Sequence, residues 1–135
     1  MKQERDNLSR AEALHLWHRV NLDAVLAAQP DLSTRQTAVL GCVYLEPGPH
    51  TVRSLARRLS VTKAVITRAL NTLGSSGFVQ RGPDPADKRS ILVGRTGRGS
   101  RYLSDFAEKI RLEARHVKQS SVSKTRARPP KRVAS

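Results

Sequence analysis

The sequence has little cysteine, few aromatic residues and no long hydrophobic run. A single cysteine, Cys42, excludes an intrachain disulfide, and the four histidines do not provide the ligand spacing of a zinc site. No apolar stretch approaches the roughly 20 residues that span a bilayer, and the N-terminus has no signal-peptide pattern. From these absences we expect a soluble, cytoplasmic protein with no metal, no cofactor and no membrane partner.

Acidic residues are also scarce: 11 Asp and Glu stand against 25 Lys and Arg, for a net charge of +14. Residues 1–30 contribute nothing to this excess, because they contain four bases and four acids. Residues 31–96 contain ten bases and four acids, and residues 97–135 contain eleven bases and three acids. Such a charge favours a polyanionic partner, bound after residue 30.

Apolar residues recur at helical spacing through most of the chain. Pro30 and Pro47 end two of these segments, and Ser33 with Gln36 forms a capping-box pattern between them. Thr51 and Thr62 stand where N-caps are expected. The chain length suits one domain, and the pattern predicts helices over residues 10–28, 34–45, 52–59, 63–73 and 98–119.

A β-hairpin is predicted between the last two helices. Phe78 and Val79 begin an apolar strand, residues 82–85 (Gly-Pro-Asp-Pro) make a turn, and residues 91–93 (Ile-Leu-Val) supply the returning strand. Two short helices followed by such a hairpin have the order of a winged helix-turn-helix. We therefore predict a mainly α fold with a small β-hairpin wing, in the α+β class.

The second helix of this motif keeps a polar face once its apolar residues are buried. Ile66, Leu70 and Leu73 form the buried side. The opposite face suits the major groove, where hydroxyl and cationic groups bind phosphates or base edges and small apolar groups contact thymine methyls. An ordinary solvated helix face is the alternative. The predicted DNA-binding residues here are Thr62, Lys63, Ala64, Val65, Thr67 and Arg68.

The hairpin supplies a second predicted DNA contact. Arg89, expected at the hairpin tip, suits a narrow A·T-rich minor groove, where negative potential is concentrated. Asp87, two residues earlier, is expected to hold the Arg89 guanidinium in a charge-assisted fork. A surface salt bridge that only stabilises the hairpin is the alternative. Further cations are predicted to bind phosphates: Arg53, Arg57, Arg58, Arg81 and Lys88.

Four segments resemble the DNA-binding domain of MarR-type regulators. They are residues 55–61 (Leu-Ala-Arg-Arg-Leu-Ser-Val), 66–68 (Ile-Thr-Arg), 77–81 (Gly-Phe-Val-Gln-Arg) and 87–89 (Asp-Lys-Arg). The resemblance implies a homodimeric winged-helix transcription factor, often a repressor, whose Asp87 and Arg89 face DNA. It also implies a small-molecule effector as a candidate partner.

The resemblance divides the chain into four parts. Residues 1–30 and 98–119 are expected to form dimerisation helices on either side of a DNA-binding domain, residues 31–97. Residues 120–135 lack acids and apolar periodicity, and we predict a disordered basic tail. The chain departs from the family in having Arg95 at the place of an apolar anchor and one C-terminal helix instead of two.

Residues that could sense a signal have simpler interpretations. Cys42 lies among apolar residues, which favours a buried small hydrophobe over a redox sensor. An effector pocket would use the residues His15, Trp17, His18, Arg19 and Tyr44, but interface packing explains them as well. We assign no ligand residue.

The resulting hypothesis is a sequence-specific regulator of the repressor type that binds double-stranded DNA as a homodimer. A nucleoid-associated architectural protein with low sequence specificity is the main alternative, and a protein-binding adaptor is a weaker one. No nucleophile elbow, phosphate-binding glycine loop or metal-ligand spacing favours an enzyme.

Overall fold

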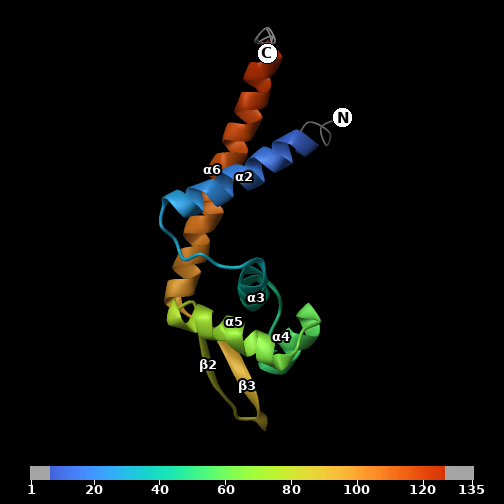
Figure 1. Ribbon diagram of the computed structural model, residues 1–135, viewed down its shortest axis with the longest axis vertical. Helices are drawn as coiled ribbons and strands as arrows, with labels where there is room; N and C mark the ends of the chain where they lie inside the picture. The colour runs from blue at the N-terminus through green and yellow to red at the C-terminus, as the bar shows by residue number, and fades with distance from the viewer. Residues whose placement is uncertain (1–6, 127–135) are drawn as a thin grey trace, which may run out of the picture. The chain divides into compact units, whose positions relative to one another are not determined.

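The computed structural model describes residues 7–126, with side chains described up to residue 120. It divides into two compact units: the head, residues 30–105, and a helical unit made of residues 7–29 and 106–126. The predicted fold class is confirmed, since helices dominate and one small sheet is present. The elements (Figure 1) are α2 (Arg10–Leu26), α3 (Thr34–Leu45), β1 (His50–Thr51), α4 (Val52–Leu59), α5 (Lys63–Ser75), β2 (Val79–Asp84), β3 (Asp87–Arg95) and α6 (Gly97–Arg126).

The helix starts in the head are fixed by local capping, as the sequence predicts. The Ser33 hydroxyl accepts the Gln36 N–H at 3.1 Å, and the Gln36 side chain accepts the Ser33 N–H at 2.8 Å. Thr51 caps α4 and Thr62 caps α5, where its hydroxyl accepts the Val65 N–H at 3.3 Å. These bonds satisfy N–H groups that the first helical turn leaves unpaired.

The core of the head lies between α3, α4, α5 and the base of the sheet. Ile66, Leu70 and Leu73 of α5 are fully buried, as predicted, together with Leu40 and Leu55. Because one side of α5 is used for packing, its opposite side is left for solvent or a partner. The face of α5 that was predicted to contact DNA therefore lies on a helix that the core holds in place.

The sheet contains a strand that the sequence pattern did not reveal. The strand order is β1-β3-β2 and both pairs are antiparallel, with His50 opposite Val93 and Thr51 opposite Leu92. A strand of two residues has no alternation to recognise, and Thr51 already serves as an N-cap. β3 is thus the central strand: β1 pairs with one of its edges, and β2, the other strand of the wing, pairs with the opposite edge.

The predicted turn of the wing was wrong. β2 continues through residues 82–84, and the chain reverses at Pro85 and Ala86. Figure 1 shows the turn of the β2–β3 hairpin at its end farthest from α5. Pro83 is tolerated because β2 is an edge strand and the register shifts between Pro83 and Asp84. The Asp84 carboxylate accepts the Ala86 N–H at 2.9 Å and closes the turn.

The hydroxyl of Tyr44 joins three segments of the head. It donates to the Phe78 carbonyl at 2.7 Å and accepts the Thr96 N–H at 2.9 Å. The Thr96 hydroxyl in turn donates to the Gly77 carbonyl at 2.6 Å and accepts the Gly99 N–H at 2.9 Å. These bonds tie the end of α3, the entry to β2 and the start of α6.

Arg95 occupies the position at which an apolar anchor is expected from the family resemblance. It has a structural role of its own beside this junction. Its Nε donates to the Val43 carbonyl at 2.9 Å, and its guanidinium lies 5.7 Å from the centre of the Tyr44 ring. The long side chain thus anchors β3 to α3 by a hydrogen bond and a cation–π contact.

In the helical unit, α2 packs on the C-terminal part of α6. Val20 of α2 and Val117 of α6 are buried there. α6 runs to Arg126 and so passes the predicted helix end at Gln119, which corrects the predicted start of the tail, while residues 127–135 lie outside the described residues. No helix within residues 7–126 is both long and apolar enough to cross a membrane.

Gly99 is the glycine that this junction requires. A Cβ at residue 99 would overlap the Tyr44 hydroxyl and the Phe78 carbonyl, whereas a Cβ at Gly97 would meet no atom within 4 Å. We expect Gly99→Ala to destabilise the protein by about 1–3 kcal/mol through overpacking. Gly97→Ala should leave stability unchanged or slightly raised. Thermal unfolding followed by circular dichroism measures both, and equal melting temperatures would contradict the prediction.

Candidate nucleic-acid interface

The predicted recognition face of α5 is exposed, with one exception. Lys63, Ala64, Thr67 and Arg68 are exposed, while Val65 is half-buried. Val65 is thus less available to a partner than the sequence suggested. Thr62 is exposed, although its hydroxyl also caps the helix.

Asn71 is an exposed residue of the same face that the sequence analysis missed. It follows Thr67 by four residues and Arg68 by three, so all three lie on one side of α5. The spacing of three and four residues from Arg68 and Thr67 is the sequence signal that places Asn71 on this face. Asn71 extends the polar face by one turn.

The cations of α4 fall into two groups. Arg53 and Arg57 are exposed, and neither takes part in an ion pair among the described residues. Arg58 instead binds Glu46, with Nε to Oε2 at 2.9 Å and Nη2 to Oε1 at 2.8 Å. These hydrogen bonds lower the pKa of the Glu46 carboxyl, so the pair is fully ionised at neutral pH. The donors with which Arg58 was predicted to bind a phosphate are therefore already occupied by the Glu46 carboxylate.

The three wing cations that were predicted to contact DNA, Arg81, Lys88 and Arg89, are all exposed. Arg89 lies on β3 and not at the tip, which corrects its expected place. The Asp87 carboxylate accepts the backbone N–H of Arg89 at 3.0 Å, and no ion pair joins the two side chains within residues 7–120. The expected fork is therefore absent, and Asp87 fixes the backbone while the guanidinium stays exposed.

All thirteen predicted contact residues fall within the head, from Arg53 on α4 to Arg89 on the wing. Arg81 extends from β2 toward α5: its Nη2 lies 4.0 Å from the point where a Cβ atom would stand if Gly74 of α5 carried a side chain. The head carries twelve Lys and Arg against five Asp and Glu, a net charge of +7. Its geometry offers a helix face and a wing on one cationic unit.

Known proteins share this arrangement. The family model described as MarR family matches residues 32–91. A crystal structure of MarR is 30% identical, with a TM-score of 0.57 and coverage of 71% of this chain and 69% of that one. The chain belongs to the MarR family.

Other MarR-family relatives extend the comparison. The transcriptional repressor NicR of Pseudomonas putida is 31% identical over 77 residues, which cover 57% of this chain and 48% of NicR. The S. aureus MepR–DNA complex has the same fold, with a TM-score of 0.65 at 19% identity and coverage of 87% and 92%. The chain aligns with less than half the length of each curated relative it matches.

Cys42 of this MarR-family chain is buried, with 9% of its surface exposed. Burial is the main cause that raises the pKa of its thiol, which keeps it protonated at neutral pH. This confirms the interpretation as a small hydrophobe. Tyr44, a candidate pocket residue, is used by the junction described above.

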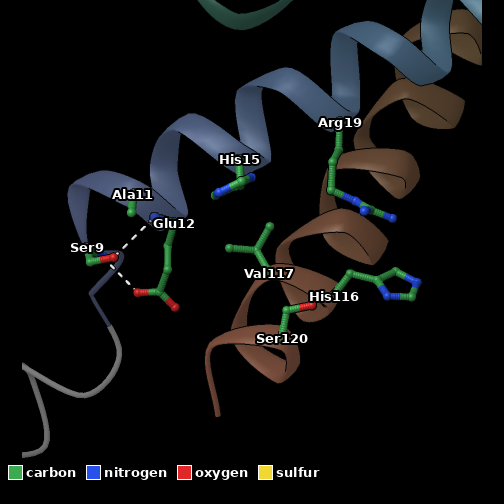
Figure 2. A pocket seen from close by; sticks show the side chains of 8 residues that line it. All are labelled: Ser9, Ala11, Glu12, His15, Arg19, His116, Val117 and Ser120. Atoms are coloured by element: carbon green, nitrogen blue, oxygen red, sulfur yellow. Dashed lines mark hydrogen bonds between the residues drawn. The ribbon is translucent and has the colours of Figure 1, made fainter. Parts of the chain in front are cut away.

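A pocket of about 320 Å³ lies between α2 and the end of α6 within the helical unit (Figure 2). His15 and Arg19, two of the candidate effector residues, line it, and Figure 2 shows His15 projecting toward Val117. The Glu12 carboxylate accepts the Ser9 N–H at 2.9 Å, so it already caps α2. The pocket residues are Ser9, Ala11, Glu12, His15, Arg19, His116, Val117 and Ser120.

Beside this pocket, two carboxyl groups and one guanidinium link α2 to α6. Arg19 forms an ion pair with Glu113, which is 8% exposed. The hydrogen bond from Arg19 lowers the pKa of Glu113, while a hydrogen bond with Glu113 raises the pKa of Asp23. A protonated Asp23 therefore fits this cluster better than an ionised one.

This cluster predicts how pH affects stability. The stabilisation from Asp23 is complete below its unfolded pKa of about 3.9 and is lost as pH rises through its raised folded pKa. An asparagine at residue 23 would offer an N–H donor to Glu113 at every pH, whereas Asp23 offers one only when it is protonated. Asp23→Asn should therefore melt at a higher temperature than wild type at pH 7, with the difference vanishing toward pH 4. The control Asp31→Asn should show no such trend, and a lower melting temperature of Asp23→Asn at pH 7 would refute the prediction.

Proposed function

We propose that the protein is a homodimeric, sequence-specific regulator that binds double-stranded DNA and acts as a repressor. The observation that supports this most is the exposed polar face of α5 beside a cationic wing, on a head of net charge +7. Membership of the MarR family and the name of the repressor NicR point the same way.

In this proposal α5 enters the major groove. Lys63 and Arg68 reach guanine edges or phosphates, and Thr67 bonds to either. Ala64 contacts a thymine methyl, and the Asn71 amide matches the donor and acceptor of adenine. The core packing of Ile66, Leu70 and Leu73 presents this face as a rigid surface.

The wing enters the adjacent minor groove through Arg89. Its exposed guanidinium carries the positive charge, and the Asp87 bond to its N–H holds the β3 backbone in place. Arg53, Arg57, Arg81 and Lys88 bind phosphates and set affinity, not sequence preference. With roughly ten phosphates neutralised per dimer, affinity falls by about three to five decades between 50 and 200 mM salt.

Dimerisation is proposed through the apolar side chains that α2 leaves exposed. Leu14 and Trp17 are 66% and 67% exposed, and Val25 and Leu26 are each 74% exposed. This is more apolar surface than a monomeric helix usually leaves in water. A twofold axis would then place two heads on half-sites about one helical turn apart.

The central test is selection from a random duplex pool with wild type and Arg89→Ala. Wild type should enrich a palindromic motif with A·T-rich flanks, because two heads read half-sites while the wings favour a narrow minor groove. Arg89→Ala should lose the flank preference and weaken binding at least tenfold, by analogy with other base-proximal arginines, which contribute about 1–3 kcal/mol.

Arg111→Ala, an exposed arginine of the helical unit, is the matched control and should behave as wild type. A flat selection profile for wild type would indicate an architectural protein in place of a regulator. Unchanged affinity and flanks for a folded Arg89→Ala would reject the wing contact alone.

The dimer is tested by Trp17→Glu. Because Trp17 is exposed in a single chain, the substitution should leave the fold intact. In the dimer it replaces an interface tryptophan by a carboxylate and should cost about 2 kcal/mol of binding free energy for each copy. We expect wild type to sediment as a dimer at micromolar concentration and Trp17→Glu to shift to monomer. Thr37→Glu, an exposed site in the head, should remain dimeric. A monomeric wild type would overturn the proposed dimer.

A further inference from the structure

The Arg58–Glu46 pair has the geometry of a bound phosphate contact. Two nearly equal hydrogen bonds, 2.9 Å from Nε and 2.8 Å from Nη2, join one edge of the guanidinium to both carboxylate oxygens. An arginine binds two oxygens of a phosphate in the same fork. Glu46 thus occupies the donors with which Arg58 would bind a DNA backbone.

The pair lies at the surface, where another anion can reach Arg58 and take the place of Glu46. The Arg58 and Glu46 side chains are 63% and 37% exposed. Exposed ion pairs are weak, so a phosphate can compete for Arg58 but must displace Glu46 to do so. Arg57, the neighbouring cation on α4, has no such partner in the described part of the chain.

We propose that Glu46 is an intramolecular competitor for DNA phosphate at Arg58 and lowers the affinity of the head for any duplex, whatever its sequence. The inference rests on the proposed DNA-binding function. Because phosphate contacts carry no sequence information, the competitor acts on affinity and salt dependence but leaves base preference unchanged. Glu46 is in this sense a positioning residue that holds Arg58 back.

The test measures binding of a random-sequence duplex by fluorescence anisotropy between 50 and 200 mM salt. Glu46→Gln keeps the shape of the side chain but weakens its hold on Arg58. It should tighten binding about two- to fivefold per head and steepen the slope of log K against log salt by about one. The base preference obtained from a selected motif should be unchanged.

Two controls separate this effect from a simple gain of charge. Asp31→Asn removes an exposed carboxylate elsewhere in the head and should change the slope much less. In an Arg58→Gln background, Glu46→Gln should add no more than Asp31→Asn does. A Glu46→Gln gain equal to that of Asp31→Asn, or a larger gain that persists without Arg58, would overturn the proposal.

A second variant keeps the test valid if Glu46→Gln folds poorly. Because Arg58 is already occupied, Arg58→Gln should weaken binding less than Arg57→Gln, and an equal or larger loss would count against the competitor. The two levels of the argument fail differently. Wild type without salt-dependent duplex binding would reject the proposed function, whereas normal wild-type binding with either contrary result rejects the role of Glu46 alone.

Discussion

The head depends on the hydrogen bonds of the Tyr44 hydroxyl. Through Phe78 and Thr96 it joins α3 to both the entry of β2 and the start of α6. The close approach leaves no room for a side chain at residue 99, so a glycine there is part of the same constraint. Since β2 and β3 leave this junction together, the base of the wing is held against the core that also holds α5.

Three of the five acidic residues of the head serve its own structure. Asp84 and Asp87 accept backbone N–H groups of the wing, and Glu46 binds Arg58. None of these carboxylates pairs with Arg81, Lys88 or Arg89 among the described residues, which leaves the wing cations exposed. With only five acids against twelve bases, three of them engaged in the turn, the β3 backbone and one arginine, the head keeps its net charge of +7.

The helical unit distributes its side chains in the opposite way. Its buried carboxylate, Glu113, pairs with Arg19 and lies beside the half-buried Asp23 between α2 and α6, while Trp17 and other large apolar residues are exposed. Polar groups at a helix contact can fix which faces meet, because a mispaired buried carboxylate is costly. The apolar residues of α2 are therefore divided between two surroundings: Val20 is buried, while Leu14, Trp17, Leu22, Val25 and Leu26 are exposed.

The sequence alone determined the three helices α3, α4 and α5, their N-caps and the core side of α5, because these follow from interactions within three or four residues and from apolar spacing. It also located the positive charge and the exposed face that includes Arg68. Only the tertiary structure decided the two-residue strand β1, the reversal at Pro85, the bond of Asp87 to a backbone N–H and the pairing of Arg58 with Glu46. Each of these depends on strand register or on a partner brought close by folding, and neither is encoded in local periodicity.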